Sequence, residues 1–358
     1  MRVLHVITSM KPGGAEKLMV DLLPKLKTLG ADAELAVFDG ADTAFMSQLE
    51  ESNVRVHKFT DEGSVYNPRH IMRLKRIMSD FDVVHTHNTS PQLFAAVAAS
   101  RLKHPPVMVT TEHNTTNRRR GNAIMRAADR WMYRHYDSVV AITPQVRDAM
   151  ISHIGENIVK TTVIPNGIDT SRFMAEADKK RKDDGMRELV MVAAFRAQKD
   201  HDTLIRAIKI LPDRFRLRLV GRGDLESKYR KMVEDLGLQE RVIFAGVRTD
   251  IPAVFRDSDY IVMSTHYEGL PISVLEAMCS GRPLLASDVP GVHELLSGAG
   301  VLFPDGDAEA LAARIMELDK SPALCEKVIK NCMDRGIKYD ISVMAKSYLQ
   351  LYKNLLDR

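Results

Sequence analysis

The sequence has no long hydrophobic run. None of its 358 residues falls in a stretch of about 18 consecutive apolar residues, which is the length that a helix needs to cross a bilayer. The first ten residues, MRVLHVITSM, have a short apolar stretch broken by His5, which predicts a first strand and not a signal peptide. We therefore expect a cytoplasmic protein whose contact with a membrane, if any, is peripheral.

Cysteine is scarce. The chain has three cysteines, Cys279, Cys325 and Cys332, and no C-x-x-C pair. An odd number without paired spacing is typical of reduced thiols and excludes a disulfide framework or a cysteine-based zinc site.

The excess of charge of one sign is also small. The formal net charge is +4, with 45% apolar and 27% charged residues, which is ordinary for a folded soluble protein. Basic and aromatic residues do not interleave, so we expect no nucleic-acid partner. The length indicates two domains of about 150–200 residues each.

Short β-rich runs alternate with segments of helical spacing in two series. The runs lie at 3–8, 33–38, 54–59, 82–87, 107–113, 138–143 and 162–165, and then at 189–195, 215–221, 241–246, 260–263, 283–287 and 300–303. This alternation predicts an α/β protein with two parallel, doubly wound sheets. We expect domains over 1–170 and 188–340, a charged linker over 171–187, and closing helices over 322–338 and 341–356.

The stretch 264–281, STHYEGLPISVLEAMCSG, combines a loop with the start of a helix. We expect Pro271 at the first helical position, where no N–H is needed, and Gly269 at a sharp turn. The N-terminus of such a helix suits a phosphate, and Glu268 and Glu276 flank it. The spacing of these glutamates alone is more typical of a solvated loop residue and a residue on the helix surface.

The whole string, with Gly281-Arg282-Pro283 and the residues 286–291 after it, resembles the donor-binding segment of the retaining GT-B glycosyltransferases of family 4. The resemblance extends over nearly the whole chain and implies two Rossmann-like domains facing across a cleft. It implies that Glu268 contacts the transferred sugar and Glu276 the nucleotide ribose. The loop residues Gly269, Leu270, Pro271 and Ile272 would complete this part of the donor site, and the last helix, within 341–358, would return to the N-terminal domain.

Two adjacent glycines, Gly13 and Gly14, follow the first strand. Glycines here let a backbone approach a ligand closely, although a plain tight turn is the alternative. The string resembles the family's glycine loop beside the donor phosphates or the acceptor. Neither this loop nor Gly221-Arg222-Gly223 has the G-x-G-x-x-G spacing of a dinucleotide site, which argues against a dehydrogenase.

Histidines follow two neighbouring strands of the first domain, at His85, His87 and His113. Such residues are often structural, but His113 resembles the family's histidine near the transferred sugar, and His87 a second family position on the acceptor side. No cysteine or carboxylate ligand set accompanies them, so we expect no zinc.

Two cations, Arg196 and Lys199, follow the first strand of the second domain. The family places a lysine here on the donor diphosphate, with an arginine five residues earlier where this chain has Ala194. Lys199 matches the pattern, and Arg196 matches it in role only. Gly221, Arg248 and Glu294 occupy family positions that line the base and diphosphate pocket.

Three D-x-D strings occur, at 80–82, 257–259 and 305–307. Such pairs hold a divalent metal in another glycosyltransferase fold, but here each lies where turns and helix caps are expected. We therefore expect no metal cofactor, with lysine, arginine and a helix dipole in its place.

Six arginines form a basic stripe in the first domain: Arg118, Arg119, Arg120, Arg126, Arg130 and Arg134. The stripe is either a solvated helix face or a surface for anionic lipid or a lipid-diphosphate acceptor.

The sequence thus predicts a glycosyltransferase that uses a UDP- or GDP-linked sugar and a saccharide or lipid-linked acceptor, in bacterial surface polysaccharide synthesis. Two alternatives stay open, a non-catalytic sugar-nucleotide-binding protein and a sugar-nucleotide epimerase of the same fold.

Overall fold

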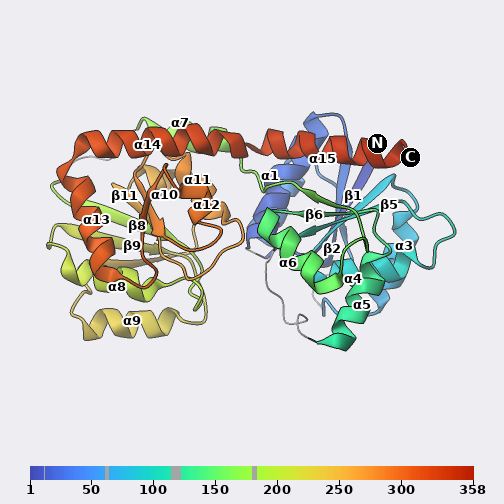
Figure 1. Cartoon of the computed structure of the whole chain (residues 1–358), viewed down its shortest axis with the longest axis horizontal. Coiled ribbons are helices and arrows are strands. Elements are labelled where there is room, and N and C mark those ends of the chain that lie inside the picture. The colour runs from blue at the N-terminus through green and yellow to red at the C-terminus, as the bar shows by residue number, and fades with distance from the viewer. Residues whose placement is uncertain (12, 61–63, 114–121, 180–183) are drawn as a thin grey trace. The chain divides into compact units, whose positions relative to one another are not determined.

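The computed structural model describes residues 1–11, 13–60, 64–113, 122–179 and 184–358. The chain forms two compact units (Figure 1). Unit 1 comprises Met1–Ile168 and Ile341–Arg358, and unit 2 comprises Asp169–Asp340.

Unit 1 is built on a seven-stranded sheet in the order β3-β2-β1-β4-β5-β6-β7. All neighbouring strands are parallel. The strands are β1 (Arg2–Ser9), β2 (Asp32–Asp39), β3 (Val56–Lys58), β4 (Val83–His87), β5 (Val107–Glu112), β6 (Ser138–Ala141) and β7 (Thr161–Val163). The helices are α1 (Gly14–Thr28), α2 (Ala44–Glu51), α3 (Arg69–Met78), α4 (Thr89–Ala99), α5 (Ala123–Tyr133), α6 (Pro144–Ile154) and α15 (Ile341–Leu356).

Unit 2 repeats the plan with a parallel six-stranded sheet in the order β10-β9-β8-β11-β12-β13. The strands are β8 (Arg187–Val192), β9 (Phe215–Val220), β10 (Val242–Gly246), β11 (Tyr260–Met263), β12 (Leu284–Ser287) and β13 (Val301–Phe303). The helices are α7 (Thr170–Ala177), α8 (His201–Ile210), α9 (Glu226–Asp235), α10 (Ile251–Arg256), α11 (Ile272–Met278), α12 (His293–Leu296), α13 (Ala308–Lys320) and α14 (Pro322–Gly336), and a 3-10 turn, η1 (Ile337–Tyr339), follows.

Helices cover both faces of the unit 1 sheet. On one face, α3, α4, α5 and α6 bury a continuous apolar cluster against strand residues such as Leu4, Val84 and Met108. The other face carries α15, which packs against α1 and β5. The strands are apolar on both sides because both faces of a parallel sheet are buried.

In each sheet, successive strands are added first toward one edge and then toward the other. The change occurs between β1 and β4 in unit 1 and between β8 and β11 in unit 2. Ligands of doubly wound folds bind beyond the carboxyl ends of the strands at such a switch point. The loops after β1, β4, β8 and β11 are therefore where each unit would hold a ligand.

The predicted α/β class with two doubly wound parallel sheets is confirmed. The segment 171–187 differs from the expected linker, because Thr170–Ala177 forms α7 within unit 2. Phe173 of α7 is buried beside Phe255, and Arg282 donates to the carbonyl of Ala177 at 2.9 Å. These contacts hold α7 against the rest of unit 2, although the charged residues of the segment had suggested an exposed linker.

Within the described part of the chain, no helix combines the length and hydrophobicity that a membrane span requires.

Candidate active site

Lys199 and Glu268 meet at the switch point of unit 2. Lys199 lies in the loop after β8 and Glu268 in the loop after β11, and these strands are neighbours. Nζ of Lys199 donates to Oε1 of Glu268, and the two side chains are only 17% and 8% exposed. The structure thus brings together a cation and a carboxylate that the sequence analysis assigned to one donor site.

Two further side chains hold the Glu268 carboxylate. Thr265 Oγ1 donates to Oε1 at 2.9 Å, and Gln198 Nε2 donates to Oε2 at 3.3 Å and to the Tyr267 carbonyl at 2.6 Å. The sequence analysis missed Gln198 and Thr265, although both lie within three residues of a predicted site residue. Together they fix the orientation of the carboxylate.

Glycines allow other loops to pass close to this pair. At Gly221, where φ is +149°, a Cβ would collide with the Ala193 carbonyl oxygen in the loop that leads to Lys199. At Gly291, where φ is +86°, a Cβ would collide with the Glu268 carbonyl oxygen. Gly221 therefore supports the loop after β8, and Gly291, which the sequence analysis did not select, supports the loop after β11.

Helix α11 begins one residue later than predicted. Pro271 is the N-cap residue, with extended backbone, and Ile272 is the first helical residue. With φ of −73° and ψ of 116°, the backbone of Pro271 is extended and not yet helical. Glu276 of this helix is buried, as are Leu270 and Pro271.

The predicted cations Arg196 and Arg248 differ in whether their side chains already have a partner. Arg196 is exposed, and among the described residues its side chain has no hydrogen-bond or ion-pair partner. Arg248 is bound by Asp250 through two hydrogen bonds of 2.8 and 2.5 Å. Glu294 accepts from the Gly291 N–H at 2.6 Å. Arg196 is thus available to an anion, whereas Arg248 already has a carboxylate partner.

Residues of the D-x-D strings accept backbone N–H groups. Asp82 accepts from the Arg2 N–H at 2.7 Å, Asp259 from Glu188 at 2.8 Å, and Asp307 caps α13 through Ala310 at 2.8 Å. Asp305 instead accepts from His266 at 2.8 Å. These contacts explain the aspartates structurally.

One group of possible metal ligands lies in unit 2. Ligand atoms of Asp200, His266 and Asp305 lie within 4.8 Å of one another. Asp200 is engaged in capping α8 through the Thr203 N–H and accepts from Ser264. The sequence analysis could not find this group, because its members are far apart in the chain.

The glycine loop of unit 1 leads into α1. Gly13 is the N-cap residue in extended backbone, and a Cβ there would collide with the carboxylate of Glu16. Burial raises the pKa of Glu16, while its own N–H and Asn88 stabilise the carboxylate. Asn88 adopts φ of +69° and donates to Thr8 at 3.3 Å. The end of β1 is thereby hydrogen-bonded to the turn after β4.

Four histidines gather at the same point. His5 Nδ1 lies 3.0 Å from His87 Nε2, and His87 Nδ1 lies 3.4 Å from His113 Nε2. His85 stacks against His87, with 4.6 Å between the ring centres. The structure thus joins the predicted His87 and His113 and adds His5, whose only signal in the sequence was that it interrupts an apolar strand.

Residues of the C-terminal helix hold His85. The Tyr352 hydroxyl lies 2.5 Å from its Nδ1 and Thr111 Oγ1 2.7 Å from its Nε2, while Tyr348 lies 3.2 Å from Thr111. Ligand atoms of His5, His85 and His87 are close enough for a metal ion. Both nitrogens of His85 are already bonded, and all three rings are buried, so the arrangement fits a hydrogen-bonded cluster better than a cation.

Of the predicted basic stripe, Arg118, Arg119 and Arg120 lie outside the described residues. Helix α5 carries Arg126, Arg130 and, at its end, Arg134, all exposed. Its single acid, Asp129, is buried and accepts from His153 at 2.9 Å. The outward face of α5 is therefore basic.

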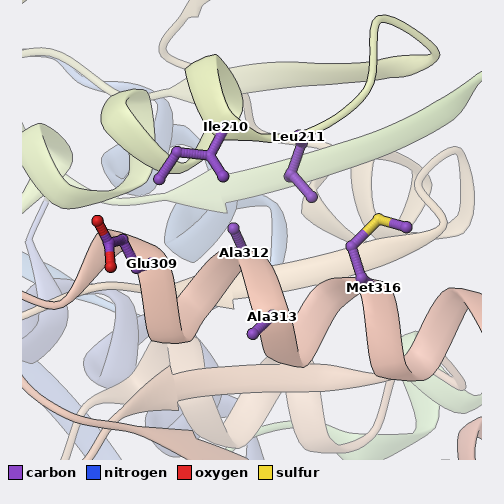
Figure 2. A pocket seen from close by; sticks show the side chains of 6 residues that line it. All are labelled: Ile210, Leu211, Glu309, Ala312, Ala313 and Met316. Atoms are coloured by element: carbon purple, nitrogen blue, oxygen red, sulfur yellow. The ribbon is translucent and has the colours of Figure 1, made fainter.

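A surface pocket of unit 2 lies elsewhere (Figure 2). The end of α8 and the helix α13 line it, with Ile210 and Leu211 on one side and Met316 on the other. None of the predicted site residues is among those that line this pocket, so it does not mark the candidate site.

Comparison with known families decides the identity. The profile described as Glycosyltransferase Family 4 matches residues 12–172, and the profile described as Glycosyl transferases group 1 matches residues 173–335. The chain belongs to the family 4 glycosyltransferases. Nearly all of unit 2, including Lys199 and Glu268, falls under the second profile.

Curated relatives of this glycosyltransferase include two bacterial enzymes. The UDP-Gal:alpha-D-GlcNAc-diphosphoundecaprenol alpha-1,3-galactosyltransferase of Escherichia coli is 26% identical over 71% of this chain and 70% of its own. The phosphatidyl-myo-inositol mannosyltransferase of Mycobacterium leprae is 25% identical over 96% of this chain and 94% of its own.

The fold of this glycosyltransferase matches solved structures. Anabaena HepE (Alr3699), crystallised with UDP-glucose, aligns with a TM-score of 0.85 and 22% identity over 99% of this chain and 100% of its own. The match confirms the GT-B fold.

Proposed function

We propose that this glycosyltransferase moves a hexose from a UDP- or GDP-linked donor to a saccharide or lipid-linked acceptor, with retention of anomeric configuration. The observation that carries the proposal is the pair formed by Lys199 and Glu268 at the switch point of unit 2. The Lys199 ammonium group can bind a diphosphate, and the Glu268 carboxylate can accept hydrogen bonds from sugar hydroxyls. A donor needs both functions in one place.

The substrates for which similar proteins are named support this choice. HepE was crystallised with UDP-glucose. The Escherichia coli enzyme is named for a UDP-galactose donor and a diphosphoundecaprenol-linked acceptor, and the Mycobacterium leprae enzyme for a phosphatidylinositol acceptor. We therefore propose a UDP-hexose donor, a lipid-linked acceptor and a role in bacterial surface polysaccharide synthesis.

In the proposed reaction, charge stabilisation and positioning supply the catalysis. Lys199, Arg196 and the backbone N–H groups at the start of α11 receive the charge that develops on the leaving diphosphate. Glu276 binds the ribose and Glu268 the transferred sugar, which holds the anomeric carbon in place for the acceptor. The acceptor attacks from the face that the diphosphate leaves, so no enzyme nucleophile takes part.

The family resemblance also assigns roles to residues of unit 1. His113 is proposed to bind a hydroxyl of the transferred sugar, and His87 lies next to it. The space beside Gly14 is open, so a ligand can approach the backbone of the Gly13-Gly14 loop closely.

We also propose that transfer needs no metal ion, since Lys199 and Arg196 provide positive charge for the diphosphate. Excess EDTA should leave the rate unchanged within about twofold, a change of less than about 0.5 kcal/mol in barrier. Loss of activity in EDTA with recovery in Mn²⁺ would overturn this, and the group of Asp200, His266 and Asp305 would then be the first site to test.

The acceptor is proposed to reach the enzyme at a membrane. Exposed Ile124 and Trp131 accompany the arginines of α5, which is the composition of helices that lie in the interface plane. Helix α3 lies on the same face of the unit 1 sheet and exposes Met72 with four cations, Arg69, Arg73, Lys75 and Arg76. We propose peripheral attachment to anionic lipid at the inner face of the plasma membrane.

The decisive experiment is a panel of UDP-, GDP- and ADP-sugars, scored by thermal shift and by release of the nucleoside diphosphate. A true donor should raise the melting temperature, because it binds the folded state, and should be turned over. Lys199→Ala should lower turnover by about 100-fold, the usual effect of removing one group that stabilises developing charge.

The control is Lys231→Ala, at an exposed position of α9, which should leave turnover unchanged. If no sugar nucleotide shifts the melting temperature or is consumed, the protein is not the proposed enzyme.

A further inference from the structure

The histidines of unit 1 form an ordered string. His5 comes from the middle of β1, His87 from the end of β4, and His113 follows β5. Contacts of 3.0 and 3.4 Å join them in the order His5, His87, His113. The string runs from the buried interior to the end of the sheet where His113 is partly exposed.

Each ring in this string is neutral near pH 7. Burial lowers the pKa of His5 to about 3 and that of His113 to about 4, and it lowers the pKa of His87 well below its usual value. A neutral imidazole has one N–H and one lone pair. Because each contact needs one donor and one acceptor, the protons of all three rings must point the same way along the string.

The buried end of the string determines that direction. Within the described part of the chain, Nε2 of His5 is buried and has no hydrogen-bond partner. A buried N–H without an acceptor is rarer in proteins than an under-used acceptor, so the proton of His5 belongs on Nδ1. His5 then donates to His87 Nε2, and His87 Nδ1–H donates to His113 Nε2.

The neighbouring His85 cannot reverse this order. Its Nδ1 is bonded to Tyr352 and its Nε2 to Thr111, so both nitrogens are directed away from the string. It contacts His5 and His87 through the faces of their rings.

We propose that His5 and His87 are positioning residues that hold His113 in its Nδ1–H tautomer, so that His113 acts only as a hydrogen-bond donor toward the transferred sugar. This rests on the proposed function, because it takes His113 to be the residue that touches the sugar. With Nε2 of His113 occupied by His87, the ring has one remaining N–H and no free lone pair. His113 is thus excluded as a general base.

The tautomer can be read from ring nitrogen resonances. Protein labelled with ¹⁵N in its histidine rings is examined by long-range ¹H–¹⁵N correlation at pH 7.5, with His113 assigned through His113→Gln. We expect Nδ1 of His113 to be protonated and Nε2 to be unprotonated. The opposite pattern, or a positively charged ring, overturns the proposal. This measurement uses the unaltered protein, so it decides the proposal even if variants fail to fold.

Two replacements of His5 then test its role. His5→Leu removes the donor at the start of the string, so His113 should become a mixture of tautomers and kcat should fall about tenfold, with the KM for the donor sugar unchanged within about twofold. The tenfold loss corresponds to one ordinary hydrogen bond. His5→Asn keeps an N–H donor and should restore both the tautomer and most of kcat.

If His5→Leu lowers kcat while the tautomer of His113 stays fixed, the effect is structural and the proposal fails. If the tautomer is as expected but no sugar nucleotide is turned over, the proposed function fails while the proton order in the string still holds.

Discussion

Lys199 and Glu268 neutralise each other in the absence of substrate. Their side chains are mostly buried, and a buried carboxylate without a partner is costly. A bound donor can compensate both charges. Its diphosphate places negative charge beside Lys199 and Arg196, and its hydroxyl groups donate hydrogen bonds to Glu268. We therefore expect the site to bind the whole sugar nucleotide better than either half alone.

The two glutamates should separate nucleotide binding from sugar binding. Glu276→Ala should weaken the free nucleoside diphosphate and the sugar nucleotide alike by about 1.5–3 kcal/mol, the value of a hydrogen bond to a charged group. Glu268→Ala should not weaken binding of the free nucleotide, because its contact is to the sugar, and should reduce turnover. Calorimetric titration with both ligands measures this.

The control for these variants is Glu234→Ala, at an exposed position of α9. If both site variants bind the free nucleotide as tightly as the unaltered protein, the assignment of Glu276 to the ribose is wrong.

Single residues of the site could be predicted where they belong to a local string. Lys199 and Glu268 are examples, because the structure brings them into contact. Gly291 and His5 could not be predicted, because their importance lies in contacts with residues far away in the sequence. A close contact between a glycine and a distant backbone carbonyl produces no periodic pattern in the sequence.

At the scale of elements, α5 combines a buried acid with an exposed basic face. Asp129 is turned inward to His153, so the outward charge of this helix comes from its arginines. Each cation near an anionic bilayer contributes about 1 kcal/mol, which makes three of them significant together with Trp131.

Replacing Arg126, Arg130 and Arg134 by Gln should therefore weaken binding to vesicles that contain anionic lipid, by about 3 kcal/mol at low salt. Co-sedimentation measures the effect, and added salt should reduce binding of the unaltered protein because it shortens the reach of charge to about 8 Å at physiological ionic strength.

The matched control replaces three cations of another helix, Lys228, Arg230 and Lys231 of α9, by Gln. Equal loss of binding in the two triple variants would mean that only total charge matters. Unchanged binding of the α5 variant to the vesicles would mean that the arginines of α5 form only a solvated helix face.

Helix α15 contributes hydroxyl groups to the interior of unit 1. Tyr352→Phe removes the partner of His85 Nδ1 and leaves a buried nitrogen unsatisfied, which should cost about 1–3 kcal/mol of stability and lower the melting temperature by several degrees. Thermal unfolding measures this, with the exposed Tyr66→Phe as the control. Equal melting temperatures for both variants would show that the hydroxyl of Tyr352 contributes nothing.

Elements were predictable where periodicity is strong. The expected strand at 260–263 and the closing helix at 341–356 have the bounds found in the structure. Helix α7 was missed although Asp169 caps it, because Arg282 and Phe255 hold it from other elements. Such contacts with distant residues cannot be predicted from the local sequence.

For the whole molecule, the buried histidines make stability depend on pH. The folded protein holds His5 at a pKa of about 3 and His113 and His201 at about 4, against 6.5 for an ordinary histidine. The unfolded chain therefore binds more protons below pH 6.5, and each such histidine removes about 1.4 kcal/mol of stability per pH unit from there down to its folded pKa.

We expect the free energy of unfolding to be nearly constant from pH 8 to 7 and to fall steadily from pH 6.5 to 5. Urea unfolding at each pH measures this, with fluorescence and circular dichroism as independent probes. A stability that rises on acidification to pH 5 would show that these rings are protonated in the folded state.

The return of the chain to unit 1 has a consequence for its synthesis. Unit 2 is one continuous segment, Asp169–Asp340, whereas unit 1 is completed only by Ile341–Arg358. Its sheet cannot receive the hydroxyls of Tyr348 and Tyr352 until α15 has been translated. On the ribosome, unit 1 can therefore be completed only after the whole of unit 2 has been translated.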